Sequence, residues 1–84
     1  IYLKKHGLNT LSKSVARAVD VWFEEDMLHV RLADGREVGV PVAWFPRLEN
    51  ASPTERKNWR LIGDGIGIHW QDLDEDISVK GLLD

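Results

Sequence analysis

The chain has 84 residues, of which 43% are hydrophobic and 30% are charged, and its formal net charge is −3. This length fits one domain, and the lack of cysteine excludes disulfides, thiol nucleophiles and thiolate metal sites. No apolar run approaches the roughly 20 residues of a membrane-spanning helix, and the acidic balance argues against a dedicated nucleic-acid-binding protein. We expect a soluble protein with no membrane contact, in the cytoplasm by default because no signal peptide is visible.

Residues 1–14 form a basic leader, which we expect to be an extra strand or a disordered segment. The remaining residues, 15–84, are expected to form a single α+β domain. The leader contains lysines and no acid, whereas residues 71–84 hold five acids against Lys80. Opposite charges at the two ends predict pairing within one chain or between two chains.

Alternating apolar and polar residues predict a meander of three antiparallel strands over residues 15–40. Glu24-Glu25-Asp26 is the first turn, and Asp34-Gly35 is the sequence cue for a tight hairpin with positive φ. Trp22 falls on the face opposite the valines of its strand, where a second copy or a partner can pack. The other face is apolar and needs a cover; it consists of Val19, Val21, Leu28, Val30, Leu32, Val38 and Val40.

The segments after the meander are predicted to supply that cover. Pro41 and Pro46 limit the residues between them to a short helical turn that presents Trp44 or Phe45 inward. Ser52-Pro53-Thr54-Glu55 has the pattern of a capping box with proline at the first helical position, which predicts a helix over residues 53–60.

Residues 61–62 and 66–70 are typical of strand segments interrupted by Gly63-Asp64-Gly65, and Asp74 is predicted to cap a last helix. The predicted fold class is therefore α+β. Its antiparallel sheet has three to four strands, begins with the meander and is covered on one face by two short helices.

Three segments together resemble the bacterial domain-of-unknown-function family numbered 2442. They are Val40-Pro-Val-Ala-Trp-Phe-Pro-Arg-Leu48, the helix of residues 51–58, and the Gly-Ile-His-Trp-Gln-Asp-Leu-Asp-Glu-Asp-Ile run of residues 67–77. The resemblance covers roughly residues 18–83. It implies a compact α+β domain, found alone or beside a DNA-binding segment, and in some genomes next to another small protein as toxin–antitoxin pairs are. The family has no established catalytic activity, so the resemblance supplies no active-site residues.

His69, Asp72, Asp74 and Asp76 have the side chains of a divalent metal site, and a metal-dependent hydrolase centred on them is one alternative function. The run is not an EF-hand, because its sixth position lacks glycine and its twelfth lacks glutamate. Acids in the first turn of a helix oppose the positive end of the helix dipole, and we favour that structural explanation. We expect no cofactor.

A catalytic dyad is a related hypothesis, with His69 as the base and Asp74 or Asp76 as the acid that orients it. The sequence marks no nucleophile, because Ser52 is used as a cap and Ser78 falls in the predicted last helix. It also has no Gly-x-Ser-x-Gly motif. An enzyme is therefore not favoured.

The basic group Arg47, Arg56, Lys57 and Arg60 has Trp59 interleaved, a pattern that grips nucleic acid. A weak nucleic-acid-binding regulator is thus a further alternative, although such a group is commonly a solvated helix face.

The function that we favour is protein interaction without catalysis. The chain is expected to form a homodimer or to be one partner of a two-component, antitoxin-like bacterial pair. Trp22 is the predicted apolar anchor, and Asp72, Asp74 and Asp76 form an acidic edge that suits a basic partner.

Overall fold

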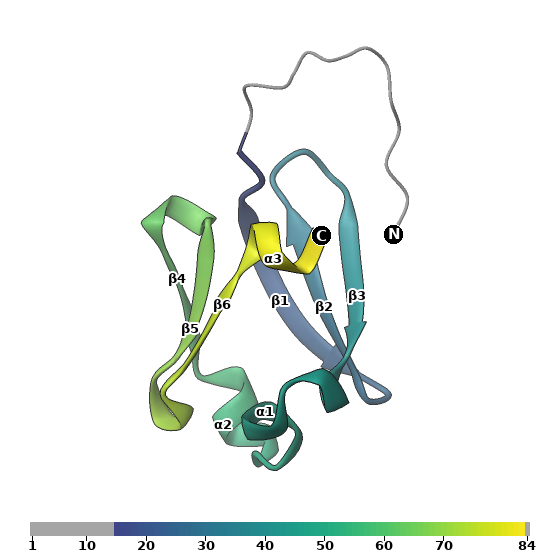
Figure 1. The fold of residues 1–84 in the computed structure, drawn as a ribbon, viewed down its shortest axis with the longest axis vertical. Helices are drawn as coiled ribbons and strands as arrows, with labels where there is room; N and C mark the ends of the chain where they lie inside the picture. Colours follow the sequence, from purple (N-terminus) through teal and green to yellow (C-terminus); the bar gives the residue numbers. More distant parts are fainter. Residues whose placement is uncertain (1–14, 84) are drawn as a thin grey trace.

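The computed structural model describes residues 15–83, which form two three-stranded antiparallel sheets joined by short helices (Figure 1). The first sheet has the order β1-β2-β3, and the second has the order β4-β5-β6. Within this part of the chain, no helix is long and apolar enough to cross a membrane. The strands are β1 (Ala18–Glu24), β2 (Met27–Leu32), β3 (Glu37–Pro41), β4 (Trp59–Ile62), β5 (Gly67–Trp70) and β6 (Glu75–Ser78).

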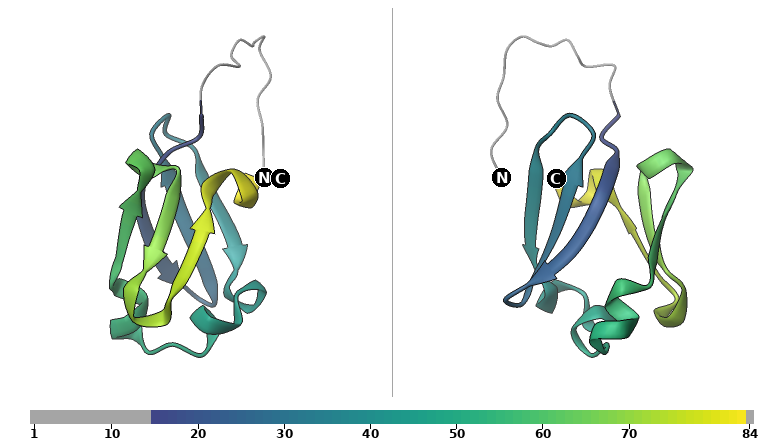
Figure 2. Two further views of the ribbon diagram at one scale, coloured as in Figure 1. Left: turned by 60° about the vertical axis from the view of Figure 1, so that its left-hand side comes forward. Right: turned by 180° about the vertical axis from the view of Figure 1, so that it is seen from behind.

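Short helices lie at the ends of the two sheets. Figure 2 shows the sheets as two layers, with α1 and α2 at one end and α3 toward the other. The α-helices are α1 (Pro46–Glu49), α2 (Pro53–Lys57) and α3 (Val79–Leu83), and the 3₁₀ turns are η2 (Val42–Trp44), η3 (Gly63–Gly65) and η4 (Gln71–Leu73).

The core lies between the sheets and is centred on Trp70, which is fully buried. Its indole Nε1–H donates a hydrogen bond to the Arg56 carbonyl (2.9 Å), and its ring meets Phe23 edge to face at 6.2 Å. A buried tryptophan needs such a partner for its N–H, and α2 provides it. The rest of the core comes from both sheets and the connecting turns: Ala18, Val21, Leu28, Val30, Leu32, Val38, Val40, Val42, Leu48, Ile68, Ile77 and Val79.

The predicted meander and its turns are confirmed. Gly35 has φ 97°, and its N–H donates to the Leu32 carbonyl (2.9 Å), which closes the second hairpin. The first hairpin turns through Glu25 (φ 51°) and Asp26 (φ 66°), so two non-glycine residues take the left-handed conformation. This is the twist that a two-residue hairpin requires.

The prediction that Val19 belongs to the core is wrong. The ladder between β1 and β2 shifts register between Ala18 and Asp20, which leaves Val19 as the extra residue of a β-bulge. The bulge turns Val19 outward, where 51% of it is exposed, and places Ala18 in the core instead. Strict alternation could not anticipate this, because one extra residue reverses the side-chain order beyond it.

The cover of the first sheet differs from the prediction. Residues 59–62, 67–70 and 75–78 do not extend the first sheet but form a second one, and this second sheet lies over its apolar face. Asp74 does not begin a helix; it is the left-handed residue (φ 52°) that ends η4. Ile77 is buried opposite Ile68, so the segment that we predicted as the start of the last helix is strand β6.

The predicted helix after Ser52 is confirmed at its start and is shorter than expected. The Ser52 hydroxyl accepts from the Glu55 N–H (3.1 Å) and the Glu55 carboxylate accepts from the Ser52 N–H (2.9 Å), which completes the capping box. The helix nevertheless ends at Lys57, because the chain from Trp59 onward pairs as a strand. The predictions for residues 1–14 lie outside the described residues.

The turns of the two hairpins provide a stability test. Replacing Asp26 by glycine should raise the free energy of unfolding by about 0.5–1 kcal/mol, because glycine has no Cβ penalty at positive φ. Gly35→Ala should lower it by about 1 kcal/mol, since alanine is strained at φ 97°. Urea denaturation of both variants measures these changes, and a loss of stability in Asp26→Gly would contradict the turn geometry.

Candidate functional site

The outer face of the first sheet carries a stacked cluster of Trp22, His29 and Arg31, which we call the Trp22 face. Trp22 and His29 are cross-strand neighbours on β1 and β2, and their rings lie nearly parallel (8°) with centroids 5.4 Å apart. The Arg31 guanidinium lies 5.5 Å from the centre of the Trp22 ring, within cation–π range. Alternation along β1 and β2 directs these side chains away from the core.

Neighbouring residues hold this cluster in place and keep it accessible. Gly39 of β3 lies opposite His29, and a Cβ at that position would come within 3.4 Å of His29 Nδ1. The Arg31 guanidinium also forms an ion pair with Glu37 (2.6 Å). Trp22 and His29 are both only partly buried. The cluster is therefore ordered within the free protein and loses little side-chain entropy on contact with a partner.

The second sheet carries a separate pair, His69 and Asp76, on its outer side. The two residues are opposite each other on β5 and β6, and His69 Nδ1 contacts Asp76 Oδ1. The His69 side chain is 19% exposed and that of Asp76 is 66% exposed. Arg60 of β4 is the other cross-strand neighbour of His69. The histidine thus lies between a basic and an acidic residue in one row across the sheet.

The other predicted metal ligands are used elsewhere. Asp72 Oδ2 accepts a hydrogen bond from the Asn58 amide (2.9 Å), and the Asp74 carbonyl accepts one from Arg47 (2.7 Å). Over residues 15–83, no group of three or more histidine, aspartate or glutamate residues is arranged to hold a metal ion. From the predicted set of four, the structure brings together only His69 and Asp76.

The predicted basic group is divided between different elements. The Arg56 guanidinium donates to the carbonyls of Leu48 (2.9 Å) and Glu49 (3.1 Å). It also lies 5.2 Å from the centre of the Phe23 ring. With Arg47 bonded to Asp74, two of the four side chains bind main-chain carbonyls within the fold. Lys57 ends α2, and Arg60 lies on β4.

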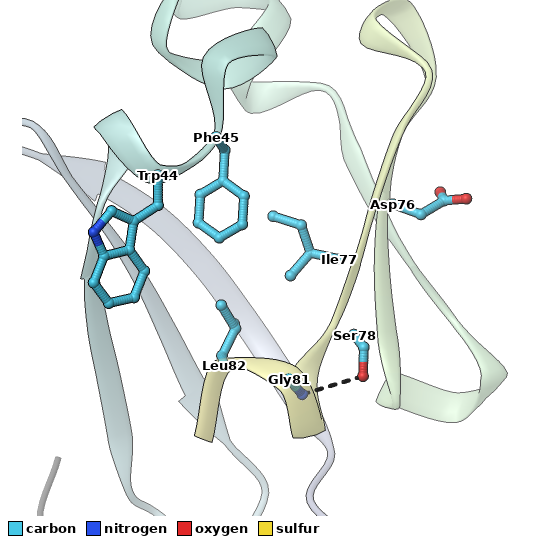
Figure 3. A pocket seen from close by; sticks show the side chains of 7 residues that line it. All are labelled: Trp44, Phe45, Asp76, Ile77, Ser78, Gly81 and Leu82. Carbon is cyan, nitrogen blue, oxygen red and sulfur yellow. Dashed lines mark hydrogen bonds between the residues drawn. The ribbon is translucent and has the colours of Figure 1, made fainter. Parts of the chain in front are cut away.

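A groove beside β6, which we call the Trp44 groove, was missed from the sequence. Its volume is about 400 Å³, and Trp44 lies at it with 65% of the residue exposed (Figure 3). The missed signal was the period of the turn: residues three apart share a face of a 3₁₀ turn, so Val42 and Phe45 point inward together and Trp44 does not. The groove is lined by Trp44, Phe45, Asp76, Ile77, Ser78, Gly81 and Leu82.

Comparisons with known proteins find similarity to proteins of unknown function. The family model described as "Protein of unknown function (DUF2442)" matches residues 18–84. A crystal structure of a protein of unknown function from Rhodospirillum rubrum is similar, with 30% sequence identity and a TM-score of 0.70 over 81% of this chain and 84% of that chain. A search of curated proteins gives no match. The matched residues include both the Trp22 face and the Trp44 groove.

The geometry of Arg56 gives a test of its role. Arg56→Gln should lower the free energy of unfolding by about 1–2 kcal/mol, because it removes charged hydrogen bonds to two carbonyls and the contact with Phe23. Lys57→Gln on the exposed side of the same helix is the matched control and should change stability by less than about 0.5 kcal/mol. Equal effects in thermal denaturation would contradict a structural role for Arg56.

Proposed function

This chain belongs to the DUF2442 family, and we propose that it acts as a protein-interaction module that self-associates through the Trp22 face. The observation that carries the proposal is the stack of Trp22 on His29 with Arg31 beside it, on the outer face of the first sheet. We propose the cytoplasm as its location, as expected from the sequence.

The residue types on this face are those that dominate binding energy at protein interfaces. Tryptophan and arginine are enriched among the residues whose truncation costs most, and they act best where neighbours hold them in one conformation. Here the His29 ring supports one face of Trp22, and Glu37 anchors Arg31. A partner that covers Trp22 would gain a large apolar contact without first having to order it.

A second copy is the partner that the charges favour. A two-fold contact uses the same patch on both copies, so the patch must complement itself. The Trp22 face meets this requirement because it carries both signs of charge: Arg31 is cross-strand to Asp20 on one side and to Glu37 on the other. Two copies packed through Trp22 can therefore exchange ion pairs at the rim.

The other functions considered receive less support. Arg47 and Arg56 are bound to main-chain carbonyls, which does not favour a nucleic-acid surface. Among residues 15–83, His69 and Asp76 form a pair with no further metal ligand beside them, which does not favour a metal-dependent hydrolase. A different small protein, as in a two-component antitoxin-like pair, remains a proposed occupant of the same face. Asp72 in η4, Asp74 after it and Asp76 on β6 are not part of the Trp22 face.

Light scattering at micromolar concentration tests self-association. We expect the mass of two chains of 9.6 kDa each, and we expect Trp22→Ser to weaken the dimer by about 30-fold, the effect of losing one strong interface residue. Trp44→Ser is the matched control, because it removes an exposed tryptophan outside the Trp22 face. A monomeric wild-type protein would contradict self-association, and a monomer that also retains no partner in a pull-down would contradict the interaction function as a whole.

A further inference from the structure

Strand β6 has a free edge beside the Trp44 groove. Among the described strands it pairs only with β5. The Val79 N–H donates to the Ile66 carbonyl (3.0 Å) at the end of this ladder. Hydrogen-bonded pairs alternate in an antiparallel ladder, so Glu75 and Ile77 bond to β5, while the N–H and C=O of Asp76 and the N–H of Ser78 face the free edge. The Ser78 carbonyl is used by α3, because Ser78 immediately precedes that helix.

The groove adjoins this edge on the inner side of β6. In Figure 3 the Ile77 side chain points toward Trp44, Phe45 and Leu82, whereas the Asp76 side chain points away from them. A strand added along β6 would continue the same alternation. Every second side chain would enter the apolar groove, and the intervening ones would lie on the outer side beside Asp76.

The charge of this edge selects the kind of strand that fits. Residues 71–83 contain four acids and one base, Lys80. The Asp76 side chain is 66% exposed. If a second copy paired through β6, Glu75 and Asp76 would lie near Glu75 and Asp76 of that copy. Repulsion between these like charges would destabilise the pairing. Lysine or arginine on the outer side of an added strand would instead be attracted.

We propose that β6 and the Trp44 groove bind an extended segment of another protein in which apolar residues alternate with lysine or arginine. The segment adds to the second sheet as a fourth strand next to β6. Main-chain hydrogen bonds to Asp76 and Ser78 give affinity, and the apolar side chains in the groove give specificity. This deepens the proposed interaction function, but it uses a surface separate from the Trp22 face.

Protection of the edge alone does not explain this arrangement. Charged residues on a short edge strand discourage pairing with other chains. Protection of the edge does not, however, explain why Trp44 lies beside it, because Trp44 is the most exposed large apolar residue of the described chain. An exposed tryptophan next to an open edge and an apolar groove is the combination that a docked strand would cover.

The binding test uses a fluorescent heptapeptide that alternates lysine and valine. We expect it to bind the full chain in an anisotropy titration, and we expect Trp44→Ala to weaken binding by at least about tenfold. In a two-dimensional NMR titration, the amide signals of Asp76 and Ser78 should shift. A peptide of the same composition with the valines grouped together should bind at least about tenfold more weakly, because it loses the alternation.

Charge reversal gives a second, independent test on an exposed residue. Asp76→Lys should reverse the preference, so that a peptide alternating glutamate and valine binds more tightly than the lysine peptide. Equal binding of the alternating and grouped peptides would overturn the proposal, as would no binding up to about 1 mM.

The same variants separate this proposal from self-association. Trp22→Ser should leave peptide binding unchanged. Trp44→Ala should leave the dimer that light scattering detects unchanged. If Trp22→Ser abolished peptide binding and Trp44→Ala left it unchanged, the assignment to β6 would be overturned, whatever the oligomeric state proves to be.

Discussion

The burial of Trp70 between the sheets is the interaction on which the rest of this structure depends. The indole belongs to β5, meets Phe23 of β1, and donates its N–H to the Arg56 carbonyl in α2. Arg56 in turn lies over Phe23 and binds two carbonyls of α1. One buried ring and one arginine therefore join both sheets to the helices between them, and an 84-residue chain relies on a few large side chains of this kind.

Because the inner faces of both sheets form this core, the polar and aromatic clusters of the described residues lie on the outer faces and edges. The first sheet presents Trp22, supported by His29 and Arg31, and the second presents the His69–Asp76 pair. Between β6, α3 and the η2 turn, the Trp44 groove is left open. The Trp22 face and the Trp44 groove are separate from each other, and they are the two surfaces for which we propose binding.

Several side chains that the sequence suggests as site residues form hydrogen bonds that stabilise the fold instead. Arg47 fixes the turn at Asp74, and Asp72 fixes Asn58 before β4. These contacts hold the connection between β5 and β6, which in turn positions the β6 edge. The acidic run is thus divided: its first members order a turn, and Asp76 stands on the exposed strand. Spacing in the sequence could not show this division, because it depends on which residues lie across from the run in space.

The sequence by itself determined the meander, the turn at Asp34-Gly35, the capping box at Ser52 and the outward position of Trp22. Each depends on neighbours within a few residues, and local propensity and alternation report such contacts directly. The tertiary structure alone decided the bulge that exposes Val19, the second sheet in place of covering helices, and the exposure of Trp44. The bulge and the second sheet depend on packing between the two sheets, and burial of Ile77 beside Ile68 in the shared core outweighs the local preference for a helix. The exposure of Trp44 follows from the 3₁₀ conformation of η2, which only the structure shows.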